Sequence, residues 1–342
     1  MNPSAEHVKF GVVVHQEALG RDPRQAVADQ LAMVHAVRDL GWDGVWSGQH
    51  FLTTGLSILQ PIPLLARLIP ETGDMDIGIG ILLLALYSPV DVAETFASLD
   101  VLSGGRLTLG VGLGYRDEEY AAFGIRRAER VERFERNLEL LARLWAGQEV
   151  DADLPWCRLE RARLTTLPLQ RPRPPIWIAA NSDRAVERAA RLGDTWMVNP
   201  HARIDTLSRQ IDLFFATREA AHLGRPRDLP IIREIFCAKD RATAIELAGP
   251  YLNAKYRTYS GWGQDKVLAD EDAFEHSFEE LRQQRFILGS PSECLAQLQW
   301  WRERFGVNYF VLRTHWAGMP LETALSSIKL LSAEVFPALH RG

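Results

Sequence analysis

The stretch Gly78-Ile-Gly-Ile-Leu-Leu-Leu-Ala-Leu-Tyr87 is the longest apolar run in the sequence. It is shorter than the roughly 20 apolar residues that a membrane-spanning helix needs. It is long enough to form a strand that is buried on both faces, which is typical of a parallel sheet covered by helices. The stretch therefore predicts an α/β fold.

On either side of this run, short apolar segments alternate with segments of helical periodicity. Val92, Phe96 and Leu99, for example, fall on one face of a helix that begins near Pro89. Eight segments are expected to form strands: Val8–Val14, Gly44–Trp46, Ile77–Leu84, Leu107–Val111, Ile176–Ala180, Thr195–Val198, Ile231–Ala238 and Tyr309–Leu312. Eight strands alternating with helices, without a domain-sized linker, favour a (β/α)8 TIM barrel over a doubly wound sheet.

We expect the 342 residues to form one barrel domain spanning 1–342. Two stretches interrupt the alternation of strands and helices. Residues 148–175 lie between the fourth and fifth strands, and residues 251–284 lie between the seventh and eighth. Long insertions in a compact domain are usually functional loops. The second insertion is therefore expected to be an active-site lid.

Composition narrows the functional class. The formal net charge of −5 argues against a nucleic-acid partner, because phosphate binding needs a dense basic patch. Cys157, Cys237 and Cys294 are far apart, which fits a reducing cytoplasm and offers no CxxC pair for a metal. The polar start of the chain lacks the apolar segment of a signal peptide. We therefore expect a cytoplasmic enzyme without a membrane or nucleic-acid partner.

Four histidines fall just after predicted strands, where a TIM barrel places its active site. His15, His50, His201 and His315 follow the first, second, sixth and eighth strands, and Trp316 follows the last of them. Each histidine alone is as easily a structural hydrogen-bonding residue as a catalyst. They form neither HxH nor HExxH, so no metal site is predicted.

Two further segments follow strands. Gly110-Val-Gly-Leu-Gly114 fails the dinucleotide pattern, because Tyr115 stands where a third glycine is needed. Its glycines fit a tight loop, or the close approach of a flat ring or phosphate. Ala179-Ala-Asn-Ser182 ends the fifth strand and opens a helix. Such a segment is an ordinary helix cap or an anion site.

Taken in order, several stretches resemble the bacterial luciferase-like flavin-dependent oxidoreductases. They are Gly41–His50, Gly78–Leu82, Ser88–Pro89, Leu99–Arg106, Gly110–Tyr115 with Glu119, Pro175–Ser182 and Ala189–Asp194, with Gly289–Pro291 and Gly306–Phe310 later in the chain. Each stretch alone is weak evidence for the family, but the combination of all of them in this order is specific to it. The resemblance implies a (β/α)8 barrel that is cytoplasmic and forms a homodimer or a higher oligomer.

The resemblance also assigns roles to the first half of the site. His50 matches the histidine that acts catalytically near the flavin, and Gln49 stands where family members often have an acidic residue. Gly80–Ile81 matches a bulge where a non-prolyl cis peptide often lies under the isoalloxazine ring.

The remaining cofactor-binding residues follow the later strands. The segment beside the flavin is matched by Leu113, Gly114 and Tyr115. The segment that holds the flavin phosphate is matched by Ala179, Ala180, Asn181 and Ser182. A polar residue after the sixth strand is matched by Asn199. Some FMN-binding members have a phosphate-binding arginine where this chain has Leu113. Lys266 and Arg285 are candidates to supply that charge instead. His15, His201, His315 and Trp316 are expected to face the substrate.

The leading hypothesis is a two-component monooxygenase. It would use O2 and reduced FMN, supplied by a separate flavin reductase, to oxidise a small organic substrate. His50 would move a proton at the flavin, and the lid would exclude water. One alternative is a reductase or dehydrogenase that uses the deazaflavin coenzyme on the same barrel. Another is a flavin-binding protein without turnover.

Overall fold

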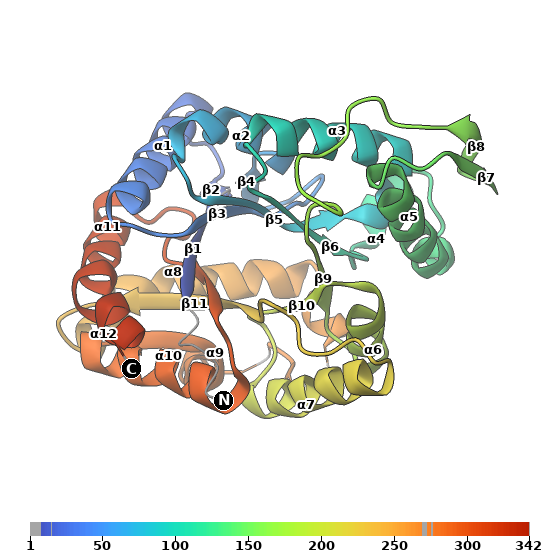
Figure 1. Ribbon diagram of the computed structural model, residues 1–342. Coiled ribbons are helices and arrows are strands. Elements are labelled where there is room, and N and C mark those ends of the chain that lie inside the picture. Colours follow the sequence, from blue (N-terminus) through green and yellow to red (C-terminus); the bar gives the residue numbers. More distant parts are fainter. Residues whose placement is uncertain (1–7, 15, 269–271, 275, 342) are drawn as a thin grey trace.

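The protein is a barrel of eight parallel strands surrounded by helices (Figure 1). The computed structural model describes residues 8–14, 16–268, 272–274 and 276–341. The barrel strands are β1 (Lys9–Val13), β3 (Gly44–Ser47), β5 (Asp76–Leu83), β6 (Leu107–Gly112), β9 (Ile176–Ala180), β10 (Thr195–Val198), β11 (Pro230–Cys237) and β13 (Tyr309–Arg313). Each overlaps one of the eight strands predicted from the sequence, so the predicted (β/α)8 architecture is confirmed.

Strand pairing closes the barrel in sequence order. Neighbours run β10-β9-β6-β5-β3-β1-β13-β11, and β10 pairs with β11 where Val198 meets Ile231. A further strand, β12 (Phe286–Gly289), pairs with the second half of β11 and was not predicted. All of these pairs are parallel, so the carboxyl ends of the strands gather at one mouth.

The barrel interior is packed with side chains and is not a pore. Trp46, Trp177 and Tyr309 form its centre, and the two indole rings stack with centroids 4.7 Å apart. The room for Trp46 comes from Gly78, where a Cβ would lie 2.2 Å from the indole. Because the interior is filled in this way, a ligand can bind only at the mouth.

Helices cover the outside of the barrel and bury their apolar faces against it. They are α1 (Pro23–Asp39), α2 (Pro61–Leu68), α3 (Pro89–Leu102), α4 (Asp117–Ala122), α5 (Arg130–Trp145), α6 (Asp183–Leu192), α7 (Ile204–Ala220), α8 (Arg241–Gly261), α9 (Phe278–Arg285), α10 (Pro291–Phe305), α11 (Leu321–Leu330) and α12 (Phe336–Arg341). Helix α10 shows how their ends are fixed. Ser290 and Glu293 form a capping box, and Gly306 ends the helix at φ 77°. None of the described helices is long and apolar enough to cross a membrane.

The two insertions have different structures. Residues 148–175 contain an antiparallel hairpin, β7 (Val150–Leu154) and β8 (Cys157–Ala162), which stands away from the barrel beside α5 (Figure 1). Residues 251–284 comprise the second half of α8, a short helical turn at Asp265–Val267 and most of α9. A small antiparallel pair that was not predicted, β2 (Gln16–Ala18) and β4 (Leu56–Ile58), joins two loops that follow barrel strands.

Candidate active site

A cavity of about 270 Å3 opens at the carboxyl ends of the strands. Segments that follow five barrel strands form most of its wall. They are Gly48–His50 after β3, Gly80–Ile81 and Leu83 in β5, Gly112–Tyr115 at the end of β6, Ile178–Ser182 at the end of β9 and Asn199–His201 after β10. The size and place of the cavity are those of a small-molecule site in a TIM barrel.

Most of the residues singled out from the sequence meet in this cavity. Those that line it are Gln49, His50, Gly80, Ile81, Leu113, Gly114, Tyr115, Ala179, Ala180, Asn181, Ser182, Asn199 and His201. His15 lies outside the described residues. The structure does not bring His315 and Trp316 to the cavity wall. The His315 ring bonds to the carbonyl of Met319, and the Trp316 indole donates to Glu234 at 2.6 Å.

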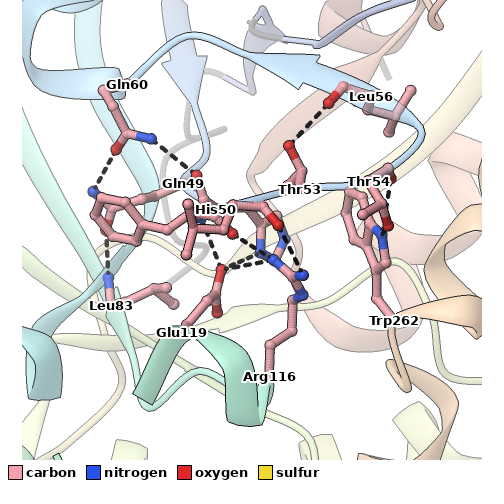
Figure 2. Close-up of polar contacts among 12 residues, drawn as sticks. Gln49, His50, Thr53, Thr54, Leu56, Gln60, Leu83, Arg116, Glu119 and Trp262 are labelled. Carbon is pink, nitrogen blue, oxygen red and sulfur yellow. Dashed lines mark hydrogen bonds and ion pairs between the residues drawn. The ribbon is translucent and has the colours of Figure 1, made fainter. Parts of the chain in front are cut away.

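His50 is held by a buried carboxylate. Its Nδ1 lies 3.1 Å from Oε1 of Glu119, which also accepts the backbone N–H of Phe51 at 2.9 Å (Figure 2). Glu119 is only 1% exposed, and Arg116 approaches the same oxygen at 3.5 Å. A carboxylate in this position keeps the proton on Nδ1, which leaves Nε2 as the nitrogen for chemistry.

Gln49 has a structural role that its place beside His50 did not reveal. Its side-chain oxygen accepts the backbone N–H of Leu83, and its nitrogen donates to Tyr87 at 2.5 Å and to Gln60 at 3.2 Å. These bonds tie the loop after β3 to the end of β5 (Figure 2). Because both ends of the amide are engaged within the protein, Gln49 positions the cavity wall through its neighbours.

The floor of the cavity is backbone. The Gly80–Ile81 peptide bond is cis, as the resemblance implied, and the register of β5 with β6 shifts between Ile79 and Leu82. A Cβ on Gly112 would lie 2.1 Å from Cδ1 of Ile81, and one on Gly80 would lie 2.7 Å from Cε of Met197. A side chain in place of either glycine would therefore displace the end of Ile81 or Met197 where β5 and β6 meet beneath the cavity.

Aromatic side chains from the second insertion close the wall near His50. Tyr259 and Trp262 lie with ring centroids 6.1 and 5.2 Å from the imidazole. Trp262 donates its indole N–H to the carbonyl of Thr54 at 3.1 Å, and Arg116 stacks over it (Figure 2). Tyr115 packs edge-on against His50 with ring centroids 5.7 Å apart, and burial raises the pKa of its phenol far above the ordinary value.

One end of the cavity is rich in arginine. Arg127, Arg130 and Arg188 line it next to Asn181 and Ser182. The hydroxyl of Ser182, the N-cap residue of α6, makes no bond to its own helix. Free N–H groups at a helix N-terminus together with guanidinium groups are the donors that a phosphate needs.

The expectation that Lys266 and Arg285 supply the phosphate charge needs correction, because these three arginines line the cavity instead. Arg285 is buried and donates to the carbonyls of His201 at 2.5 Å and Asp272 at 2.8 Å. Lys266 is exposed, and neither residue lines the cavity. The arginines were missed because Arg127 lies in the turn before α5, Arg130 begins α5 and Arg188 lies on α6, where the sequence does not show the direction of a side chain.

Another end of the cavity carries a buried ionic group. Lys255 of α8 and Arg313 of β13 line the cavity, and both approach Glu234 of β11. Glu234 also accepts the indole N–H of Trp316. Burial lowers the pKa of Lys255 to about 8, and the charge of Arg313 acts in the same direction. The Glu234 carboxylate opposes this shift. Among the described residues, no group of three or more His, Cys, Asp or Glu side chains could hold a metal ion.

Comparison with known proteins agrees with this geometry. The sequence profile of the luciferase-like monooxygenase family matches residues 8–308. The chain belongs to this family. Its members are oxidoreductases, and they include flavin-dependent monooxygenases and F420-dependent enzymes.

The relatives match the chain to different extents. The oxygenase component of the flavin-dependent trigonelline monooxygenase of Acinetobacter baylyi is 23% identical over 97% of this chain and 95% of its own length. The F420-dependent hydroxymycolic acid dehydrogenase of Mycobacterium tuberculosis is 32% identical over 63% of this chain and 60% of its own. The crystal structure of monooxygenase RslO1 from Streptomyces bottropensis has the same fold, with a TM-score of 0.85 at 22% identity over 96% of this chain and 99% of that chain.

Proposed function

We propose that this protein is the oxygenase component of a two-component monooxygenase, which uses reduced FMN and O2 on a small organic substrate. One observation carries the proposal. A single cavity joins the Gly80–Ile81 bulge, the His50–Glu119 pair and an arginine-rich end that suits a phosphate. The likeness to a flavin-dependent oxygenase component over almost the whole chain supports it. We also propose that a separate reductase supplies the flavin and that the protein forms a homodimer.

The residues present fit a flavin mononucleotide. The glycine floor between Gly80 and Gly112 offers a backbone surface on which a flat ring can lie, and added Cβ atoms would collide there. The arginine-rich end holds Arg127, Arg130 and Arg188, of which Arg127 pairs with Asp117 and Arg188 with Glu135. Three cations thus face two carboxylates, which leaves one net positive charge to meet an anionic phosphate.

The chain's own residues would position the cofactor and move a proton. When bound, the flavin supplies the redox chemistry with O2. Glu119 holds His50 through Nδ1, so Nε2 is the nitrogen that would give or take a proton at the reacting centre. Trp262, anchored on Thr54, and Tyr259 cover this centre and would exclude water from it.

Flavin binding and the reaction with O2 test the proposal directly. Oxidised FMN should bind to the purified protein with a clear preference over riboflavin, because the arginine-rich end holds the phosphate. When reduced FMN and the protein are mixed with O2 in a stopped-flow instrument, the oxidised flavin absorbance should return more slowly than with free flavin. Tight binding of the deazaflavin coenzyme F420 together with no binding of FMN would contradict the proposal.

An F420-dependent dehydrogenase is the second candidate function. The relative from Mycobacterium tuberculosis favours it, with the higher identity over a shorter part of the chain. Leu113, which stands at the cavity in place of a phosphate-binding arginine, is compatible with either cofactor. When bound, F420 would supply the hydride chemistry, and His50 would donate or accept a proton on the substrate. Titration of the protein with F420 and with FMN separates the two functions.

A further inference from the structure

The end of the cavity formed by α8, β11 and β13 has a charge that the proposed cofactor phosphate does not explain. Lys255 and Arg313 both line the cavity there, while Arg127, Arg130 and Arg188 belong to its other end. Lys255 is 5% exposed and Arg313 is 9% exposed, so both cations are largely removed from water. Two cations on one stretch of the cavity wall favour an anionic ligand in the space beside them.

Among the described residues, the carboxylate of Glu234 contacts both cations. Glu234 accepts from Lys255, and the same oxygen lies 3.8 Å from Nε of Arg313. Its other oxygen accepts the indole N–H of Trp316. Two cations that line the cavity thus share contact with the Glu234 carboxylate. Arg233, which follows Ile232 in β11, adds a third buried positive charge outside the cavity wall.

His201 gives independent evidence for a polar ligand atom at this end of the cavity. The residue is 8% exposed and lines the cavity, and its Nδ1 has no hydrogen-bond partner in the part of the chain that the structure describes. Burial and then the charges of Lys255 and Arg313 hold the pKa of the imidazole well below its ordinary value. A neutral imidazole nitrogen that is buried and unpaired beside a cavity marks a place for a polar ligand atom.

We propose that the substrate is a carboxylate, and that its anionic group binds between Lys255, Arg313 and His201. Guanidinium matches a carboxylate through two parallel hydrogen bonds, and the lysine adds a point charge. Ile232, Val267 and Tyr259 line the cavity nearby and suit the hydrocarbon body of such a substrate. The inference rests on the proposed function, because it requires that the substrate share the cavity with the flavin.

A purely structural role for these residues gives a different expectation. The Lys255–Glu234 pair joins α8 to β11 and would do so without any ligand. That role does not explain why Arg313 lines the cavity or why His201 leaves Nδ1 unpaired. It also predicts that a carboxylate and its uncharged amide bind equally well. Binding of matched pairs therefore separates the two interpretations.

Isothermal titration calorimetry with benzoate and benzamide, and with hexanoate and hexanamide, provides the test. Each compound is titrated at pH 7 into the protein alone and into the protein saturated with oxidised FMN. The carboxylates should bind about 30-fold more tightly than the amides, the fold-change expected when one partner of a buried charged pair is lost. Equal affinities within each pair, or no binding of either carboxylate, would overturn the proposal.

Variants locate the site. Lys255→Met and Arg313→Met should each remove most of the preference for carboxylate, with unfolding midpoints used to confirm that the variants are folded. Lys9→Met is the matched control, because Lys9 pairs with Asp76 at the amino ends of β1 and β5, away from the mouth. The control should bind carboxylates as the wild type does. An unchanged preference in a folded Arg313→Met protein would contradict the assignment.

The two proposals fail in different ways. If FMN does not bind but the carboxylate preference is present, the subsite stands and the monooxygenase proposal fails. If FMN binds and the amides bind as well as the carboxylates, the subsite proposal fails alone. Competition between benzoate and FMN would assign the cations at Lys255 and Arg313 to the cofactor, which would also overturn the inference.

Discussion

The Nδ1 atom of His50 lies 3.1 Å from a carboxylate oxygen of Glu119, a residue 69 positions later in the chain. Helix α4 carries Glu119 beneath the loop after β3, and the same oxygen accepts the backbone N–H of Phe51. One buried carboxylate thus fixes both the ring of His50 and the loop that bears it. This arrangement makes the orientation of the imidazole part of the fold.

The first prediction concerns this carboxylate. Glu119→Gln keeps the shape of the side chain, but its amide nitrogen can favour the wrong tautomer of His50. Turnover with reduced FMN should fall by about 100-fold, the usual contribution of a positioned proton-transfer group. The Kd for FMN should change little, because Glu119 is not part of the cavity wall. Turnover and flavin titration measure the two effects.

A double variant separates positioning from a merely structural effect. If Glu119 acts through His50, then adding Glu119→Gln to His50→Ala should cost little further turnover, because the two residues act as a unit. Glu119→Asp should recover part of the activity by restoring the charge. Additive losses in the double variant would show that Glu119 does not act through His50.

The second prediction concerns the arginine-rich end. Arg188→Met should weaken FMN binding by about 10- to 100-fold, the range for the loss of a hydrogen bond to a charged group. The affinity for riboflavin, which lacks the phosphate, should stay the same. Arg191→Met on the same helix is the control, because Arg191 is exposed and does not line the cavity. Equal losses for FMN and riboflavin would contradict a phosphate role.

The third prediction compares two glycines of β6. A Cβ on Gly110 would lie 2.1 Å from the carbonyl oxygen of Ile79, which is backbone and cannot move cheaply. A Cβ on Gly112 would meet only the terminal methyl of Ile81, which can rotate into the cavity. Gly110→Ala should therefore lower the free energy of unfolding by about 1–3 kcal/mol, and Gly112→Ala should mainly weaken flavin binding.

Urea denaturation and flavin titration on both variants decide this point. Gly261→Ala serves as the control, since its added Cβ meets nothing within 4 Å at the end of α8. It should leave flavin binding unchanged and stabilise the helix by at most about 1 kcal/mol. A Gly112→Ala protein with full flavin affinity would show that the floor between β5 and β6 does not contact the ring.

The barrel could be predicted because each strand and helix can be recognised from residues that are close together in the sequence. Each strand is a short apolar run, such as Leu107–Val111, and the helices between them show their own period. The carboxyl ends of parallel strands meet at one mouth, which explains why His50, Asn199 and His201 line the same cavity. Strand β12 was missed, as it continues the short helix α9 without a turn signal.

The electrostatics of the site depend on contacts that the sequence does not contain. Arg285 was a candidate for phosphate binding, but the fold turns it toward the carbonyls of His201 and Asp272. Trp316 was expected at the substrate, and its indole N–H instead engages Glu234. The sequence did contain one indication of the charged group at the cavity. Arg233 and Glu234 stand inside an otherwise apolar strand, and buried charges in a strand usually mark a site.

The fourth prediction concerns the pH dependence of carboxylate binding at Lys255. The groups that face its ammonium come from three barrel strands or their loops and from its own helix: Glu234 on β11, Arg313 on β13, His201 after β10, and the rings of Tyr256 and Tyr259 on α8. Burial holds the imidazole of His201 neutral and raises the pKa of the Tyr256 phenol far above its ordinary value. Burial lowers the pKa of Lys255 to about 8, so the charge of its ammonium changes near that pH.

Benzoate affinity should be constant from pH 6.5 to about 7.5 and should fall above pH 8. The reason is that the pKa of Lys255 in the folded protein is lowered to about 8, so its positive charge is lost as the pH rises through that value. The decrease should approach tenfold per pH unit, since binding must then take up a proton. Lys255→Arg keeps its charge throughout this range and should give a flat profile. Calorimetric titrations of both proteins between pH 6.5 and 9.5 measure the difference, and a flat profile for the wild type would contradict a direct contact between Lys255 and the carboxylate.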